Sequence, residues 1–135
     1  MKKVKAHIEK GSDGIFSVYM FDESLDYSIN GQGKTADEAI ADFVAVYNDT
    51  KKFYEEQGMD FTEVEFEYKY DFSALLASYA EVFTLVGLSR ITGINKSQLS
   101  HYLNGTSNPS VRTTARINEG GRNYASRLAQ MATVQ

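Results

Sequence analysis

The sequence predicts an α+β protein with two parts: a β-β-β-α-β domain over residues 1–71 and an all-helical domain over residues 72–135. Before residue 71, apolar and polar residues alternate with period two in four stretches, which is typical of strands. After residue 72, apolar residues recur every three or four positions, which is typical of helices. The charge changes at the same point. Residues 1–71 hold eight Lys, no Arg and 16 acidic residues, a net charge of −8, whereas residues 72–135 hold six basic and two acidic residues, a net charge of +4.

This charge difference indicates that the two parts meet different partners. The Arg-rich carboxy-terminal part can bind phosphates, which the acidic amino-terminal part would repel. Chance variation between short segments is the alternative explanation.

The overall composition narrows the class of protein. With 42% hydrophobic and 24% charged residues, the 135-residue chain has a globular composition without long disorder. It has no Cys and only two His, which excludes disulfides and a Cys nucleophile and argues against a zinc site. No apolar run approaches the ~20 residues that span a bilayer, and the charged first residues lack the apolar core of a signal peptide, so a cytoplasmic protein without a membrane partner is expected.

Three alternating runs predict a meander of strands at the start of the chain. Their apolar residues are Val4, Ala6 and Ile8 in the first run, Phe16, Val18 and Met20 in the second, and Leu25, Tyr27 and Ile29 in the third. Turn-forming residues separate the runs at positions 12–14 and 22–24, and Gly31 and Gly33 close the third strand.

A helix and a fourth strand complete the amino-terminal part. Thr35 is the expected N-cap and Glu38 the third residue of a capping box, and Gly58 is the expected stop. The predicted buried face of the helix is Ala36, Ala39, Ile40, Phe43, Val44, Tyr47 and Tyr54. The fourth strand alternates an apolar face with a charged one, formed by Val64, Phe66, Tyr68 and Tyr70 and by Glu63, Glu65, Glu67 and Lys69.

The acidic residues of this part do not predict an enzyme. Most lie at turns or at the helix start, where each has a local structural reason. Glu63, Glu65 and Glu67 share one strand face and could form a metal patch, but a solvated face is the favoured interpretation. His7 lies on the polar face of the first strand with no catalytic partner tied to it by spacing. We therefore expect no catalytic residues, no metal and no cofactor.

The carboxy-terminal part begins with helical apolar spacing and then shows a helix, a short turn and a second helix. A first helix carries Phe72, Leu75, Leu76, Tyr79, Val82 and Phe83. A second runs from about Leu85 to Thr92, Gly93 breaks it, and Asn95 can cap a third helix over residues 96–104, which ends at Gly105.

The outer face of the helix at residues 96–104 is polar and free of acids. Leu99, Tyr102 and Leu103 are expected to face inward, which leaves Lys96, Ser97, Gln98, Ser100, His101 and Asn104 outward. This spacing predicts a helix-turn-helix whose second helix enters the major groove of double-stranded operator DNA. Ser97, Gln98 and His101 would reach base edges, whereas Lys96, Asn104 and nearby arginines would hold phosphates. A purely structural helical hairpin is the alternative.

The last segment predicts a helix capped by Ser110. Gly120 and Gly121 are expected to weaken, split or bend it. The arginines of this segment are either phosphate contacts or solvated residues, and Arg112 is assigned to the DNA-binding site; the others are Arg116, Arg122 and Arg127.

Two family resemblances cover nearly the whole chain. Residues 85–110 resemble the Cro/cI-type (Xre-like) helix-turn-helix, most specifically in the run Leu-Ser-His-Tyr-Leu-Asn-Gly and the following Asn-Pro-Ser. The amino-terminal part resembles the HicB antitoxin domain, a partial ribonuclease-H-like fold, in Asp13-Gly14, Phe16, Val18 and the run Gly33-Lys34-Thr35-Ala36-Asp37-Glu38-Ala39. Asp22 to Asp26 stand where that family commonly has Leu-Pro-Gly-Cys.

The resemblance implies a homodimeric antitoxin that neutralises a HicA-type, messenger-RNA-cleaving toxin and represses its own toxin–antitoxin operon. Charge fits this expectation, because an acidic domain can mask a basic RNA-binding toxin while the basic domain holds DNA. A solitary transcriptional regulator without a toxin partner is the alternative, and an enzyme ranks third.

Overall fold

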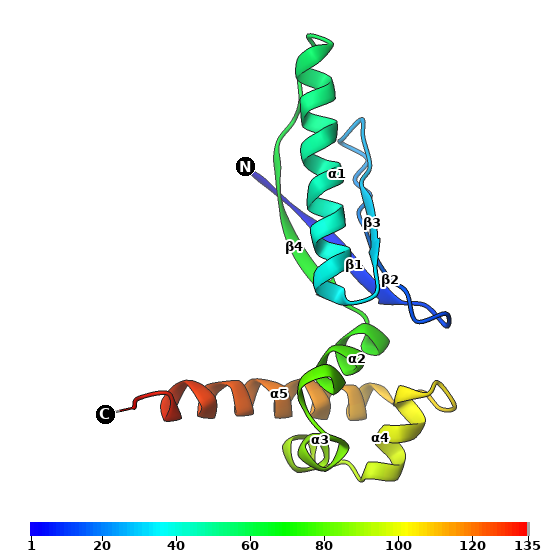
Figure 1. Ribbon diagram of the computed structural model, residues 1–135, viewed down its shortest axis with the longest axis vertical. Coiled ribbons are helices and arrows are strands. Elements are labelled where there is room, and N and C mark those ends of the chain that lie inside the picture. The colour runs from blue at the N-terminus through cyan, green and yellow to red at the C-terminus, as the bar shows by residue number, and fades with distance from the viewer. Residues whose placement is uncertain (135) are drawn as a thin grey trace. The chain divides into compact units, whose positions relative to one another are not determined.

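The computed structural model describes residues 1–134, and its four strands and five helices confirm the α+β class (Figure 1). The chain divides into two compact units, Met1–Ser78 and Tyr79–Gln135. The division falls inside helix α2, Phe72–Val82, whereas the change in composition placed it just before this helix. Residues 72–78 carry no charge, so the net charges of −8 and +4 hold for the two structural units as well. Among the described residues, no helix combines the length and apolar character that crossing a membrane requires.

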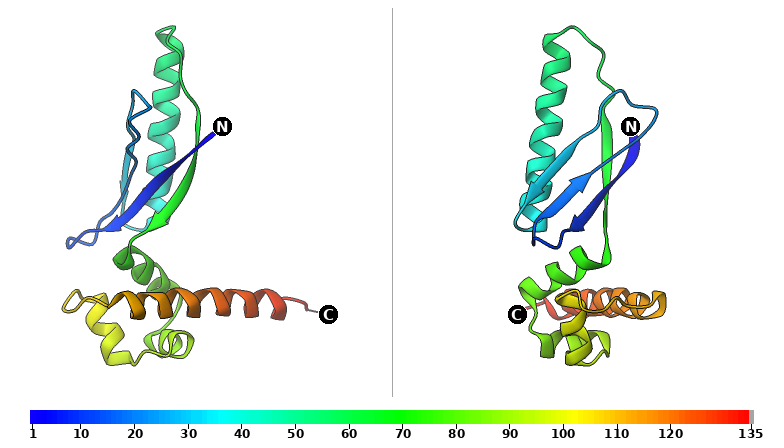
Figure 2. Two further views of the ribbon diagram at one scale, coloured as in Figure 1. Left: turned by 180° about the vertical axis from the view of Figure 1, so that it is seen from behind. Right: turned by 90° about the vertical axis from the view of Figure 1, so that its right-hand side faces the viewer.

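The first unit is a four-stranded mixed sheet with one long helix on one face (Figure 2). Strands β1 (Lys2–Lys10), β2 (Phe16–Tyr19), β3 (Asn30–Gly33) and β4 (Val64–Tyr70) lie in the order β3-β2-β1-β4. β1 pairs antiparallel with β2 and parallel with β4. A parallel neighbour needs a crossover connection, and helix α1 (Ala36–Glu56) supplies it between β3 and β4. The predicted strand–strand–strand–helix–strand order is therefore confirmed.

The third strand is shorter and later than predicted. The run containing Leu25 and Tyr27 is not a strand, and β3 comprises Asn30–Gly33, which follows the fully buried Ile29. Gly31 and Gly33 are both paired residues of this strand, and Gly33 ends it as predicted. A Cβ on Gly31 would collide with the backbone nitrogen of Phe43 in α1. A Cβ on Gly33 would lie 2.6 Å from the backbone nitrogen of Ala39, which is too close. The two glycines therefore let α1 lie directly on the strand, a constraint that alternation cannot reveal.

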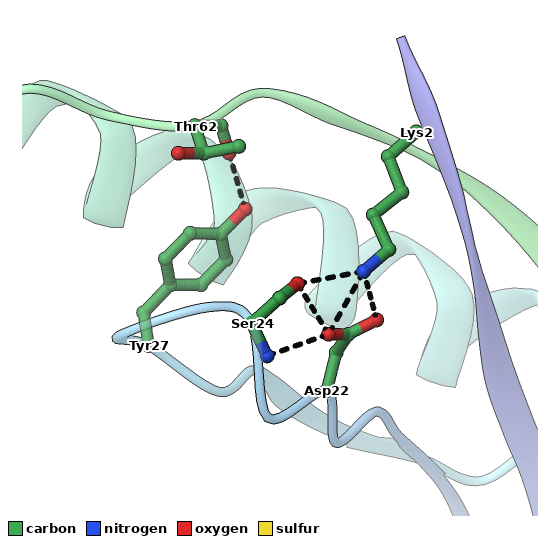
Figure 3. Close-up of polar contacts among 5 residues, drawn as sticks. All are labelled: Lys2, Asp22, Ser24, Tyr27 and Thr62. Carbon is green, nitrogen blue, oxygen red and sulfur yellow. Dashed lines mark hydrogen bonds and ion pairs between the residues drawn. The ribbon is translucent and has the colours of Figure 1, made fainter.

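The connection between β2 and β3 is anchored at two points (Figure 3). The Asp22 carboxylate lies 3.0 Å from Lys2 Nζ and accepts hydrogen bonds from the hydroxyl and the backbone N–H of Ser24. The Ser24 hydroxyl and the Lys2 ammonium together lower the pKa of Asp22 to about 2. Farther along, the Tyr27 hydroxyl donates to the carbonyl of Thr62, just before β4. These contacts replace strand pairing as the means of holding this segment.

The ends of α1 follow its local sequence. The Thr35 side chain accepts from the N–H of Glu38, as predicted, although the Glu38 carboxylate accepts from the N–H of Lys34 rather than from that of Thr35. Gly58 has a φ of +66° and donates to Glu55 O, and the next N–H reaches back to Tyr54. This is a Schellman ending, in which glycine adopts the left-handed conformation at low cost.

The core of the first unit lies between α1 and the sheet. Phe43 is fully buried, and its ring meets those of Phe66 and Tyr68 edge-on. Val44 was predicted on the same face but is 39% exposed. The face of α1 that meets the sheet is narrower than the apolar pattern suggested, because Val44 lies about 100° around the helix from the fully buried Phe43 and so falls at its edge.

The second unit begins with the last residues of α2 and continues through short helices α3 (Leu85–Thr92) and α4 (Lys96–Leu103) and the long helix α5 (Val111–Met131). Their N-caps are Thr84, Asn95 and Ser110. Each N-cap side chain accepts a hydrogen bond from the backbone N–H of the residue three positions later. α3 contacts both α4 and α5. The buried side chains of this unit are Leu88, Thr92, Ile94, Leu99, Tyr102 and Ile117.

Helix α5 is continuous, so the expectation that Gly120 and Gly121 split it is wrong. Both glycines lie where other parts of the unit come close. A Cβ on Gly120 would collide with the carbonyl oxygen of Ile91 at the end of α3, and one on Gly121 would collide with the Tyr79 hydroxyl. Packing at this crossing offsets the low helix propensity of glycine.

Replacing Gly120 with alanine is expected to lower the free energy of unfolding by about 1–3 kcal/mol, because the new methyl group overpacks the contact with Ile91. Helix propensity alone would instead stabilise the protein by about 1 kcal/mol. Gly87→Ala in α3 is the control: its Cβ would meet Thr84 Oγ1 at an ordinary 3.4 Å, so no loss is expected. Denaturant unfolding followed by circular dichroism measures the free energy of unfolding of both variants. A Gly120→Ala protein as stable as the parent would contradict the close contact between α5 and Ile91 of α3.

Candidate nucleic-acid interface

A tight three-residue turn joins α3 to α4. Gly93 ends α3 with a φ of +74°, and its N–H donates to Ser89 O. Ile94 is buried, and its N–H donates to the hydroxyl of Thr92, which in turn donates to Leu88 O. The chain therefore reverses through a left-handed glycine, and a buried Ile and an internally bonded Thr hold the turn against the unit.

Arg116 of α5 adds a second constraint on this turn. Its guanidinium Nη2 donates to the carbonyl oxygen of Gly93 at 3.0 Å. The sequence pattern left Arg116 as either a phosphate contact or a solvated residue, whereas it connects α5 to the turn. No local pattern reveals this role, because the two residues are 23 positions apart.

Helix α4 buries one face and exposes the other. Leu99 is completely buried and Tyr102 nearly so, and Leu103 is half-buried, as predicted. The exposed residues include five of those assigned to DNA: Lys96, Ser97, Gln98, His101 and Asn104. Ser100 was also expected outward but is half-buried, because it lies at the border of the two faces. Arg112 is exposed on a different element, in the first turn of α5.

The Gln98 amide is held by a residue one turn along the helix. Its Nε2 donates to the Tyr102 hydroxyl at 2.8 Å. The amide keeps its carbonyl oxygen and a second N–H hydrogen for a ligand. An amide fixed in this way can make a bidentate contact with little loss of side-chain entropy.

Thr106 organises the other end of the exposed face. Gly105, with a φ of +78°, turns the chain after α4, and the backbone N–H of Thr106 donates to His101 O. The Thr106 hydroxyl lies 2.8 Å from His101 Nδ1 and 2.7 Å from Asn104 Oδ1. Sequence reasoning placed Thr106 only in a loop and missed this role, although the Asn-Gly-Thr turn after the helix was the available signal.

The electrostatic character of the second unit suits an anionic ligand. Residues 82–118 contain no Asp or Glu, but they contain Arg90, Lys96, Arg112 and Arg116. The first turns of α3, α4 and α5 lack acidic residues, whereas α1 of the first unit has two there. The amino ends of the three helices therefore keep their positive dipole ends unneutralised.

Two carboxylates of the charged strand face, Glu63 and Glu67, are engaged in ion pairs. Glu67 pairs with Lys69 at 2.8 Å, and the hydrogen bond from Lys69 lowers the pKa of Glu67. Glu63 pairs with Lys51 of α1. Within residues 1–134, no three His, Asp or Glu side chains converge as a metal site would require.

No protein-family model, no curated protein and no solved structure matches this chain. Its function is therefore inferred from the residues and contacts described above.

Proposed function

We propose that the second unit is a helix-turn-helix DNA-binding domain and that the chain is a sequence-specific transcriptional repressor. The observation that carries this proposal is the exposed face of α4, where Lys96, Gln98 and His101 stand on a short helix behind a tight turn, with no acidic residue nearby in sequence. A helix of this kind fits the major groove of B-DNA.

Each exposed side chain suits one kind of contact. Gln98 can bind adenine through its free carbonyl oxygen and N–H, and Lys96 can bind guanine acceptors or a phosphate. Ser97 lies in the first turn of α4, the part of a recognition helix that contacts base edges. Asn104 and Arg112 are exposed and suit contacts to phosphates, which position the protein without reading sequence.

The wild-type protein tests the proposal directly. Gel shifts with the DNA upstream of its own gene are expected to show a specific complex that survives an excess of unrelated duplex. The affinity should fall as salt rises, because bound phosphates release counterions. If both duplexes bind equally, or neither binds, the proposal is wrong.

We further propose that the protein acts as a homodimer joined through α5. After Ile117 enters the core, the apolar stripe of this helix continues through Tyr124, Leu128 and Met131. Leu128 is 45% and Met131 56% exposed. Beside them lies an apolar groove of about 200 Å³, lined among others by Phe83, Tyr124 and Leu128.

A second copy of the chain is the occupant that fits this stripe. One face supplies both the projecting side chains and a groove to receive them, which is the self-complementarity that a two-fold interface needs. A two-fold dimer would also present two copies of α4 to the half-sites of a palindrome, about 34 Å or a multiple apart.

Replacing Leu128 with aspartate is expected to convert the dimer to monomer, because a charge would be buried unpaired at the interface. DNA affinity should fall with it, since one half-site contact is lost. Ser126→Asp is the control, because it adds the same charge on the opposite side of α5, where the residue is exposed. Sedimentation velocity measures the mass, and a Leu128→Asp protein that keeps the parent's mass, or a monomeric parent, would contradict this interface.

We propose that the first unit binds a HicA-type toxin, so that the chain is an antitoxin that represses its own operon. Its net charge of −8 and its β-β-β-α-β order support this role. We expect a short reading frame for a basic protein directly beside the gene. On co-expression, its product is expected to co-purify with the first unit. A missing neighbour would favour a solitary regulator, a candidate that draws support from the Asp22 segment, where the resemblance to the antitoxin domain departs.

A further inference from the structure

We infer that His101 reads its base as a hydrogen-bond acceptor, through Nε2, and so selects the exocyclic amine of cytosine or adenine. The inference rests on the proposed DNA-binding function and specifies what one residue of that site recognises. It follows from the direction of three hydrogen bonds around Thr106.

The first bond fixes the orientation of the Asn104 amide. The backbone N–H of Thr106 can only donate; it is shared between His101 O at 3.0 Å and Asn104 Oδ1 at 3.1 Å. The opposite amide orientation would place an NH₂ group against this N–H, two donors facing each other. The atom facing Thr106 is therefore the acceptor oxygen.

The second bond fixes the hydroxyl hydrogen of Thr106. Its Oγ1 lies 2.7 Å from the same Asn104 oxygen, which has no hydrogen to give. At this distance the single hydroxyl hydrogen must lie between the two oxygens. The alternative acceptor, His101 O, is farther away at 3.3 Å.

The third bond then fixes the tautomer of His101. Because the Thr106 hydroxyl has used its hydrogen, its Oγ1 can only accept from His101 Nδ1, 2.8 Å away. Nδ1 therefore carries the proton of the neutral imidazole, and Nε2 has a free lone pair. Since His101 is exposed, Nε2 is the ring nitrogen that remains for a ligand.

The major groove distinguishes an acceptor from a donor at each base. Cytosine N4 and adenine N6 are donors there, whereas guanine N7 and O6 and thymine O4 are acceptors. An Nε2 lone pair bonds the first two bases and is repelled by the other two. Thr106 acts as a positioning residue that sets this preference without touching DNA.

A selection of duplexes from a randomised library tests the preference, and the operator sequence does not have to be specified for it. The position read by His101 is the one whose preference disappears in His101→Ala. There the wild type is expected to favour cytosine or adenine over guanine or thymine by about 5- to 150-fold. Thr106→Val should lose this preference, because valine cannot accept from Nδ1, whereas Thr106→Ser should keep it. Guanine or thymine at that position, or an unchanged preference in Thr106→Val, would overturn the inference while DNA binding stands.

Nitrogen-15 NMR of the free protein supplies a readout that needs neither DNA nor a variant. The neutral ring of His101 is expected to carry its proton on Nδ1, and a proton on Nε2 would overturn the inference. A protein that selects no duplex at all would instead overturn the proposed function, on which the inference rests.

Discussion

Replacing Gln98 and His101 together with alanine is expected to weaken specific DNA binding by about 2–6 kcal/mol, because each good base contact contributes about 1–3 kcal/mol of discrimination. The two side chains are exposed and about one turn apart on α4, and they hydrogen-bond to different residues, Tyr102 for Gln98 and Thr106 for His101, so each substitution removes one side chain available for a base contact. Affinity for unrelated duplex, which depends on phosphate contacts, should change little. Titrations of the operator and of an unrelated duplex measure both quantities.

Two controls separate lost base contacts from other effects. Gln130→Ala removes an exposed amide from the far end of α5 and should leave operator affinity unchanged. Lys96→Ala should weaken specific and unrelated duplexes together and reduce the salt dependence by about one counterion, if its ammonium holds a phosphate. If the Gln98/His101 double variant binds its operator as the parent does, α4 is not the recognition helix.

Replacing Phe43 with alanine is expected to destabilise the first unit by about 3–5 kcal/mol. The side chain is fully buried, and its ring meets Phe66 at a centroid distance of 4.7 Å and Tyr68 at 6.2 Å. The backbone of Phe43 also lies directly on Gly31 of β3, so the surrounding structure has little room to collapse into the cavity. Small domains have a total stability of about 5–15 kcal/mol, so this change would leave the unit marginal.

Phe53→Ala is the matched control for this prediction. It makes the same truncation in the same helix, but Phe53 is 53% exposed. A loss below about 1 kcal/mol is expected there, since less apolar area leaves water on folding. Chemical unfolding of both variants, followed by tyrosine fluorescence, measures the difference. Equal losses at the two positions would show that the core is not where α1 meets the sheet.

Local sequence predicted helix ends in both units. The caps at Thr35 in the first unit and at Asn95 and Ser110 in the second, together with the left-handed Gly93, were all recognisable, because capping involves residues within one turn of each other. The alternation of β1 and β4 was equally clear, since β1 buries one face, and on the matching face of β4 Val64 is buried and Phe66 and Tyr68 are half-buried. Tyr70, predicted on the same face, is 41% exposed at the end of the strand.

The third strand was predicted wrongly because two kinds of burial look alike in sequence. Ile29 is buried, and Leu25 and Tyr27 pack against the core, as strand residues would. Their segment is held instead by side-chain contacts to Lys2 and to the carbonyl of Thr62. An alternating pattern reports which residues are buried but does not report which backbone groups are paired.

The sequence by itself determined the α+β class, the order of the elements, the charge of each unit and the polar outer face of α4, because these depend on composition and on spacing along the chain. Tertiary structure alone decided the roles of Gly31, Gly120 and Arg116. The two glycines look like helix or strand breakers until a neighbouring backbone is seen to occupy the space of their missing Cβ atoms. The arginine acts through a carbonyl group 23 positions away, which only the folded chain brings within hydrogen-bond distance.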